Sequence, residues 1–338
     1  MRATIVDISK RTGLSLATIS KYMNGGNVRP ENREKIEEAI EFLHYRVNET
    51  ARSLVTNRTR TIGVIVYTIE NLFAGTLVRS LGTFFRKHGY GLFICDSNED
   101  ERTERENILA MIRKNVDGII LMPVGRDSRM MRPIREAGIP AVCLDRKIEG
   151  SGCPSVTVTN EETMADLTRL VIEKGHQRIA YIGSTIEYTG SERLSGFRKA
   201  MKEADLEILP GYEHLERHSL RAGYQGMTSL LQLQPRPTAV LLGNYEISLG
   251  AVMAVHDSGY TYPKDISMAA FDNLMLMDVV YPHITTAVQP TEEMAVSAGE
   301  MLLEMMEAPD DQEMPVPEDR VLAAKIQKYD SISEPCAI

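Results

Sequence analysis

The stretch TIVDISKRTGLSLATISKYMNG, residues 4–25, predicts two short helices around a tight turn. Thr4 can cap the first helix, and Ser15 is a good N-cap for the second. Gly13 lies between them, at a position where the backbone often needs a positive φ. The apolar residues of 30–43 recur at spacings of three and four, which predicts a third helix. The chain therefore begins with a small all-α head.

The second of these helices has side chains that suit DNA better than a protein core. Leu16, Ala17, Thr18, Ser20 and Lys21 are small or basic. A helix that enters the major groove by its N-terminal end needs such side chains near phosphates and bases. The charge supports this interpretation, because residues 1–60 carry a balance of +4 while the remainder carries −13, giving −9 in all. An ordinary helical hairpin remains the alternative.

Beyond residue 60 the pattern predicts an α/β body. Apolar, β-rich runs alternate with helical patterns: TIGVIVY (61–67), GLFICD (91–96), DGIILMP (117–123), PAVCLD (140–145), SVTV (155–158), RIAYIG (178–183), AVLLG (239–243) and ISMAAFD (266–272). Continuous apolar runs indicate strands buried on both faces, as in a parallel sheet covered by helices. The runs are too many for one comfortable sheet, so we expect two doubly wound lobes.

The segment 4–25 resembles the N-terminus of the LacI/GalR family of transcriptional regulators, whose usual form is close to TIxDVAxxAGVSxxTVSxxLNG. Further blocks follow in family order: ENREKIEEAIEFLHYRVNETARSL (31–54), TRTIGVIV (59–66), SERLSGFRKAM (191–201), RPTAVLLGN (236–244), ISMAAFDN (266–273) and ITTAVQP (284–290). The resemblance implies a helix-turn-helix head and a body of periplasmic-binding-protein type. It also implies a repressor that binds a palindromic double-stranded DNA operator as a homodimer, under the control of a small effector.

The resemblance also implies domain boundaries. The helix-turn-helix domain would span 1–46, a hinge helix and linker 47–60, and the effector-binding and dimerisation domain 61–338. Within that domain the N-lobe would take about 61–159 and 290–319, and the C-lobe about 160–289 and 320–332. The segment after Arg320 is expected to form a strand and a frayed tail. It contains no leucine heptad, so we expect a dimer rather than a tetramer.

DNA-contacting residues follow from the resemblance. Leu16, Ala17 and Lys21 occupy its base-reading positions. The other implied DNA contacts are Thr4, Ser15, Thr18, Ser20, Asn24 and Arg52. Leu54, in the segment that matches the hinge helix, would wedge into the minor groove and kink the DNA. A core leucine is the alternative for Leu54, and Val47 stands where the family often has Pro.

Effector-binding residues are expected at the carboxyl ends of strands, where open α/β sheets bind ligands. The expected set is Leu72, Phe73, Asp145, Arg193, His218, Asn244, Asp272 and Gln289. The resemblance implies that the effector is a sugar, a sugar derivative or a nucleobase. Arg193 is the strongest candidate, because a guanidinium offers a rigid fork of donors. Two departures change the ligand set: Tyr245 replaces the usual Asp, and His218 replaces a common aromatic residue.

Other classes of protein lack their signals in this sequence. No apolar run approaches the ~20 residues of a membrane helix, and early charges argue against a secretory signal. The four cysteines form no disulfide framework or zinc pattern, which favours the cytoplasm. His214 and His218 are expected to be exposed rather than metal ligands. Without GxGxxG, GxxxxGK[ST], GxSxG or HExxH motifs, we expect neither an enzyme nor a cofactor. The alternative function is a sugar-binding protein without a DNA role.

Overall fold

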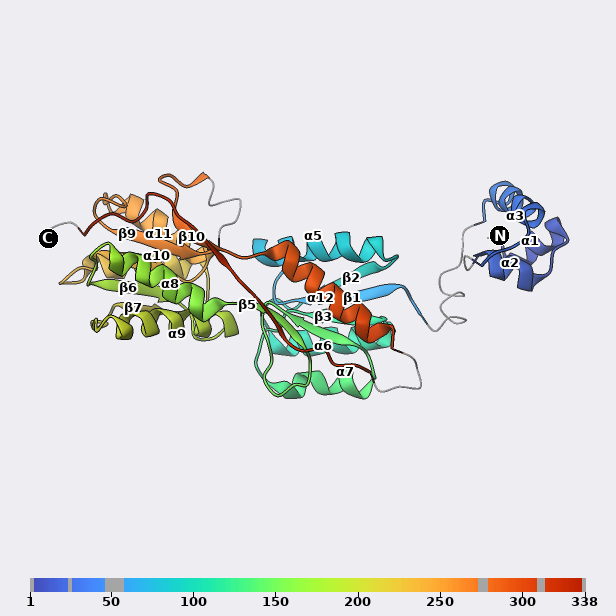
Figure 1. The fold of residues 1–338 in the computed structure, drawn as a ribbon, viewed down its shortest axis with the longest axis horizontal. Coiled ribbons are helices and arrows are strands. Elements are labelled where there is room, and N and C mark those ends of the chain that lie inside the picture. Colours follow the sequence, from blue (N-terminus) through green and yellow to red (C-terminus); the bar gives the residue numbers. More distant parts are fainter. Residues whose placement is uncertain (1–2, 24–25, 46–57, 273–278, 309–313, 336–338) are drawn as a thin grey trace. The chain divides into compact units, whose positions relative to one another are not determined.

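The computed structural model describes residues 3–23, 26–45, 58–272, 279–308 and 314–335. The chain divides into two compact units, Met1–Thr59 and Arg60–Ile338, which we call the head and the body (Figure 1).

The head is a three-helix unit built around a small apolar core. Its helices are α1 (Ile5–Thr12), α2 (Leu16–Met23) and α3 (Pro30–Phe42). One fully buried isoleucine comes from each helix: Ile8, Ile19 and Ile36. At the start of α1 the backbone N–H and the hydroxyl of Thr4 both donate to the Asp7 carboxylate, at 2.9 and 2.8 Å. Gly13 ends this helix with a φ of 72°, as the turn requires.

The first lobe of the body contains a six-stranded sheet in the order β11-β5-β4-β3-β1-β2. All neighbouring strands run parallel. The strands are β1 (Thr61–Val66), β2 (Gly91–Asp96), β3 (Gly118–Leu121), β4 (Ala141–Leu144), β5 (Ser155–Val158) and β11 (Arg320–Leu322). The helices are α5 (Leu72–Lys87), α6 (Glu101–Arg113), α7 (Arg132–Glu136), preceded by the 3₁₀ turn η1 (Ser128–Met131), and α12 (Thr291–Met306).

The second lobe repeats this plan, with the strand order β12-β10-β9-β8-β6-β7. Its pairings are parallel except for that of β10 with β12. The strands are β6 (Ile179–Gly183), β7 (Glu213–Leu215), β8 (Ala239–Leu242), β9 (Ser267–Phe271), β10 (Thr285–Val288) and β12 (Lys325–Gln327). The helices are α8 (Asn160–Glu173), α9 (Tyr188–Glu203), α10 (Leu220–Gln232) and α11 (Tyr245–Asp257).

Each sheet is covered by helices on both faces, which explains its continuous apolar strands. In β1, Val64 packs on the side of α5 and α12, while Ile65 packs on the side of α6 and α7. In β6, Tyr181 lies on the α8 and α9 side and Ile182 on the α10 and α11 side. Alternate residues of one strand therefore enter two different cores, so both must be apolar. The two doubly wound lobes are the fold that the sequence predicts.

The chain passes between the lobes three times, as Figure 1 shows, and the third passage corrects one boundary. We expected 320–332 to lie in the C-lobe. Residues 320–322 instead form β11, which pairs with Val156–Val158 of the first sheet. Only β12 joins the second sheet, beside β10. A three-residue strand carries too little pattern to choose a sheet, and its backbone pairing decides.

The tail after β12 is held in place rather than frayed through residue 335. Ser331 is fully buried, and its hydroxyl donates to Met268 O at 2.6 Å. The backbone N–H of Thr285 donates to the same hydroxyl at 2.8 Å. His176 lies 2.9 Å from the carbonyl oxygen of Ser333. These polar contacts fasten the tail to the second lobe.

Candidate functional site

A cavity lies between the carboxyl ends of the two sheets, and both lobes contribute to it. The described residues that line it are Tyr67, Asn71, Phe73, Glu99, Asp145, Arg146, Glu187, Thr189, Arg193, His218, Asn244, Tyr245, Glu246, Asp272 and Gln289. They follow strands of both sheets, as expected for ligand sites in open α/β folds. Polar side chains dominate the lining.

The first lobe contributes an aspartate–arginine pair directly after β4. Asp145 has a φ of 71°, and its backbone N–H donates to Val156 O at 2.9 Å. The Arg146 Nε lies 3.7 Å from Asp145 Oδ2, and its guanidinium stacks 3.9 Å above the Tyr67 ring. Burial raises the pKa of Asp145 to about 6, although the charges of Arg146 and Arg193 oppose the increase. Asp145 is therefore mostly ionised at neutral pH.

The second lobe contributes a matching pair from β9 and α9. Arg193 Nη1 lies 3.5 Å from Asp272 Oδ2 and donates to Gly243 O at 2.8 Å. Its Nε donates to Asn160 Oδ1 at 2.9 Å, and its guanidinium stacks 3.7 Å above the Phe271 ring. The Arg193 side chain is 3% exposed, and its Nε and Nη1 atoms are both engaged by protein groups. It is held by groups from α8 and from the ends of β8 and β9.

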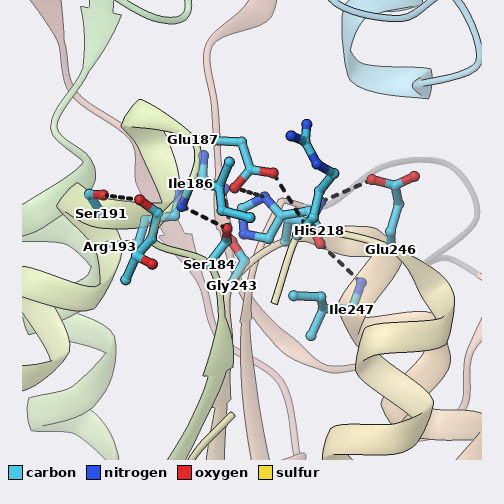
Figure 2. A network of polar contacts seen from close by, with 12 residues as sticks. Ser184, Ile186, Glu187, Ser191, Arg193, His218, Gly243, Glu246 and Ile247 are labelled. Carbon is cyan, nitrogen blue, oxygen red and sulfur yellow. Dashed lines mark hydrogen bonds and ion pairs between the residues drawn. The ribbon is translucent and has the colours of Figure 1, made fainter. Parts of the chain in front are cut away.

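A buried glutamate–histidine contact forms one wall of the cavity (Figure 2). The backbone N–H of His218 donates to Glu187 Oε1 at 3.4 Å, and His218 Nδ1 lies 4.0 Å from Glu187 Oε2. Burial lowers the pKa of His218 to about 4. The ring is therefore neutral at pH 7, and this contact is not an ion pair there. The expectation of an exposed side chain is wrong for His218, which is 8% exposed.

The two lobes are joined by direct polar contacts at the cavity. Asn71 caps α5, and its Nδ2 donates to Glu246 Oε2 of the other lobe at 3.2 Å. The Leu72 backbone N–H donates to the Tyr245 hydroxyl at 3.1 Å. Burial and the nearby charges of Glu99 and Asp272 raise the pKa of Glu246 to about 7, against the hydrogen bonds from Asn244 and Asn71. Tyr245 and Glu246 at the start of α11 therefore contact the other lobe.

Two arginines join the lobes outside these contacts. Arg126 Nη2 donates to Glu187 O at 2.8 Å and to the Ser191 hydroxyl at 2.6 Å. Arg217 Nη1 lies 3.1 Å from Glu99 Oε2, which comes from the first lobe. The two lobes are therefore closed against each other, and polar groups of one lobe contact polar groups of the other.

The structure brings most of the expected effector residues together. Those that line the cavity are Phe73, Asp145, Arg193, His218, Asn244, Asp272 and Gln289. Leu72 does not line it: its side chain is 39% exposed, and only its backbone N–H meets the other lobe. Eight further residues line the cavity but were not in the expected set: Tyr67, Asn71, Glu99, Arg146, Glu187, Thr189, Tyr245 and Glu246. Two of them, Arg146 and Tyr245, directly follow an expected residue, and this position was a usable signal.

In the head, the expected base-reading residues lie on the outer face of α2. Leu16 is 47% exposed, and Ala17 and Lys21 are also exposed. Ile19 of the same helix is fully buried. The Ser15 hydroxyl accepts a hydrogen bond from the backbone N–H of Thr18 at 3.2 Å and so caps α2.

The remaining expected DNA contacts differ in setting. Thr4 is exposed, but its hydroxyl is engaged by Asp7. Ser20 is half-buried within α2. Asn24, Arg52 and Leu54 lie outside the described residues.

The described residues form no group of three or more His, Cys, Asp or Glu that could hold a metal ion. None of the described helices is long and apolar enough to cross a membrane.

An all-α head with an exposed second helix, together with a two-lobed body around a polar cavity, defines the class of ligand-controlled DNA-binding regulators.

Comparison with known proteins identifies the family. Residues 4–48 match the model of bacterial regulatory proteins of the lacI family, and residues 168–326 match the periplasmic binding protein-like domain. The HTH-type transcriptional regulator RegA of Clostridium saccharobutylicum is 33% identical, over 90% of this chain and 93% of that protein. The ribose operon repressor of Escherichia coli strain K12 is 32% identical, over 91% and 94%.

The fold comparison agrees. The Lac repressor dimer bound to operator and the anti-inducer ONPF superposes with a TM-score of 0.88 at 21% identity, covering 98% of this chain and 100% of that one. The chain belongs to the LacI family. It is a DNA-binding transcriptional regulator with an effector-binding domain, and its relatives are regulators rather than enzymes.

Proposed function

We propose that the chain acts in the cytoplasm as a repressor, that it binds a palindromic operator as a homodimer, and that a sugar, sugar derivative or nucleobase in the cavity alters operator affinity. The observation that carries the proposal is the cavity itself. Asp145 of one lobe and the Arg193–Asp272 pair of the other face the same space. Buried polar groups that converge from two lobes can hold one small ligand and report its presence.

DNA recognition is assigned to the exposed face of α2. Leu16 and Ala17 offer apolar surface, which suits thymine methyl groups, and Lys21 suits a phosphate or a guanine edge. Ser15, Thr18, Ser20 and Thr4 are assigned contacts to the DNA backbone or base edges. For Asn24, Arg52 and the Leu54 wedge the proposal rests on the sequence alone. The same holds for a hinge over 47–60.

Coupling between effector and DNA is assigned to the contacts between the lobes. A ligand that bonds to both Asp145 and Arg193 adds to the contacts that Asn71 and Leu72 make with α11. It therefore favours one arrangement of the lobes over another. Such coupling energies are typically about 1–3 kcal/mol, enough to change operator occupancy several-fold.

Homodimer formation is supported by apolar side chains that the body leaves exposed. Met253 on α11 is 47% exposed, Ile94 on the edge strand β2 is 39% exposed, and Tyr281 is 85% exposed. These side chains come from both lobes, and a dimer interface that covered them would remove apolar surface from water. Light scattering that gave a monomer at micromolar concentration would contradict the dimer.

The experiment that tests the function is selection of bound fragments from the sheared genomic DNA of the source organism. We expect enrichment of a palindromic sequence, with affinity that falls steeply as salt increases, because basic residues contact phosphates. A thermal-shift screen over sugars, sugar derivatives and nucleobases then finds the effector, since a ligand specific to the folded state raises the melting temperature. Absence of any enriched sequence would contradict the proposal.

A further inference from the structure

The charges around the cavity are unbalanced. Among the described lining residues, carboxylates come from Glu99, Asp145, Glu187, Glu246 and Asp272, whereas guanidinium groups come only from Arg146 and Arg193. The undescribed segment 273–278, which follows Asp272, contains neither Lys nor Arg. His218 adds no positive charge at neutral pH. Arg217 compensates Glu99, and Glu246 is only partly ionised at neutral pH because its pKa is raised to about 7. No described Lys or Arg forms an ion pair with Glu187, so the lining still carries excess negative charge, and Glu187 is its main source.

Each guanidinium is already paired with an aspartate, Arg193 with Asp272 and Arg146 with Asp145, so an anion that approached either one would meet a like charge. Arg193 is engaged by Asp272, Asn160 and Gly243. Arg146 donates through Nη1 to Pro123 O at 3.1 Å. Its Nε has no hydrogen-bond partner among the described residues, but it lies 3.7 Å from the Asp145 carboxylate. A carboxylate or phosphate that accepted from Arg146 Nε would meet the like charge of Asp145.

Three other buried atoms of the lining lack hydrogen-bond partners in the described part of the chain: Glu187 Oε2, Gln289 Oε1 and His218 Nε2. The first two are acceptors only, and they need a ligand that donates. A neutral imidazole nitrogen donates or accepts according to its tautomer. A hydroxyl group both donates and accepts, so it satisfies all three kinds of atom. An ionised carboxylate on a ligand donates nothing and would leave Glu187 Oε2 unpaired.

We propose that the cavity selects its effector by charge: it takes a hydroxyl-bearing molecule without negative charge and excludes the carboxylate and phosphate analogues of that molecule. This inference rests on the proposed function, because it concerns the effector of the same cavity. Glu187 is the specificity-determining residue. Its unpaired oxygen accepts from a ligand hydroxyl and repels a ligand anion.

The test uses matched sets of compounds on the full-length protein: ribose, glucose, galactose and cellobiose, each beside its aldonic acid and a phosphate ester. Isothermal titration follows a thermal-shift screen. A neutral member that binds is expected to exceed its anionic analogues by about 100-fold in affinity, because like charges a few ångströms apart repel strongly in a buried site. An anionic member that binds as tightly as its neutral analogue overturns the inference.

If every set fails to bind, native mass spectrometry of the protein after incubation with cell extract identifies the molecule that it retains. Retention of an uncharged hydroxylic compound supports the inference, and retention of a sugar acid or sugar phosphate overturns it. A protein that binds its operator but retains and responds to nothing overturns the proposed effector control as well. Binding of an anionic effector would therefore contradict only the charge selectivity. Absence of any effector would contradict both the charge selectivity and the proposed effector control.

The variant Glu187→Gln assigns the effect to one residue. Glutamine keeps the acceptor for the His218 backbone N–H but carries no charge. We expect the ratio of the affinity for a neutral ligand to that for its anionic analogue to fall by about tenfold, because one nearby negative charge is lost. Glu162→Gln, an exposed carboxylate on α8, is the matched control and should leave the ratio unchanged. The melting temperature without ligand checks that both variants fold. A ratio that Glu187→Gln leaves unchanged overturns the assignment.

Discussion

Asp145 and Asp272 occupy equivalent positions in the two lobes. Each follows the last residue of a central strand, and their φ values are 71° and 72°. The backbone N–H of each donates at 2.9 Å to the neighbouring strand, to Val156 O and Ala287 O respectively. Each carboxylate pairs with an arginine that stacks on an aromatic ring. The same local motif therefore occurs once in each lobe, and both copies line the cavity.

This motif predicts different effects for two substitutions of Asp272. Asparagine tolerates a positive φ, so Asp272→Asn should fold but bind the effector about 10-fold to 100-fold more weakly, because the charge beside Arg193 is lost. Alanine is strained in this conformation, so Asp272→Ala should also lower the melting temperature. Titration with a neutral ligand that binds the wild type, together with thermal melts, checks both. Equal melting temperatures for the two variants would contradict the backbone argument.

Lys21 on the outer face of α2 is predicted to contact the operator. Lys21→Ala should weaken operator binding by about tenfold, as expected for loss of one phosphate or guanine contact. Lys35→Ala, an exposed lysine on α3, is the matched control and should have a smaller effect. Fluorescence anisotropy with the selected operator, repeated over a range of salt concentrations, measures both. If Lys21→Ala kept full affinity and specificity, α2 would not be the recognition helix.

Glu104 on α6 predicts a dependence of stability on pH. Its side chain is fully buried, and burial raises its pKa from 4.5 to about 7, with the hydrogen bond from the Val124 N–H opposing the increase. The folded state therefore holds the proton more tightly than the unfolded state. This contribution is complete below pH 4.5, and the free energy of unfolding falls as the pH rises through 7.

Replacing this carboxylate by its amide should remove the pH effect. Glu104→Gln keeps an acceptor for the Val124 N–H, 2.8 Å away, without the charge. We expect it to gain about 1–3 kcal/mol of stability at pH 8 and little at pH 5. Denaturant unfolding at both pH values measures the difference, with Glu106→Gln, an exposed carboxylate on the same helix, as control. A gain of the same size at pH 5 would rule out titration of Glu104 as the cause.

The contact between Tyr245 and Leu72 predicts a local change in dynamics. Tyr245→Phe removes the acceptor of the Leu72 backbone N–H while keeping the ring. Loss of one such hydrogen bond should speed amide exchange at Leu72 about fivefold. Hydrogen-exchange measurements on peptides around Leu72 detect this, and peptides of the head serve as the internal reference. Unchanged exchange would show that this contact does not hold the lobes together in solution.

Gly250 on α11 allows two helices to approach closely. A Cβ added there would lie 2.0 Å from Leu220 O of α10. Gly250→Ala should therefore destabilise the body by about 1–3 kcal/mol, the usual effect of overpacking. Gly75 on α5 is the matched control, because a Cβ added there meets nothing within 4 Å. Gly75→Ala should be neutral or stabilising by up to about 1 kcal/mol, since alanine favours helix. Thermal unfolding distinguishes the two, and equal effects would contradict the packing argument.

Much of the fold follows from local sequence patterns. The helices of the head follow from Thr4, Gly13 and Ser15, because caps and turns depend on the conformations of a few neighbouring residues. The eight expected strands of the body are all present, since a strand covered on both faces must be continuously apolar. The strands β7 and β10 were not expected, and two strands, β11 and β12, stand where one was expected after Arg320. These strands of three or four residues carry too little periodic pattern to be recognised.

The cavity is only partly encoded in this local way. Asp145 and Asp272 could be expected there because they stand at strand ends, whereas Arg193, which lies within α9, could be expected only because it matches a position of a known family. Glu187 could not, since it lies in a loop between β6 and α9 with no pattern of its own. Its proximity to His218, 31 residues later, exists only in the folded chain.

The sequence alone determined the class of fold, the order of domains and the family, because these depend on short-range periodicity and on motifs that the chain carries intact. The tertiary structure alone decided which sheet β11 joins and which buried atoms remain unpaired. It also decided that Leu72 contacts the other lobe through its backbone N–H and does not line the cavity with its side chain. The physical reason is distance along the chain. Backbone pairing, burial and charge at one point are summed over residues that are remote in sequence, and only folding brings them together.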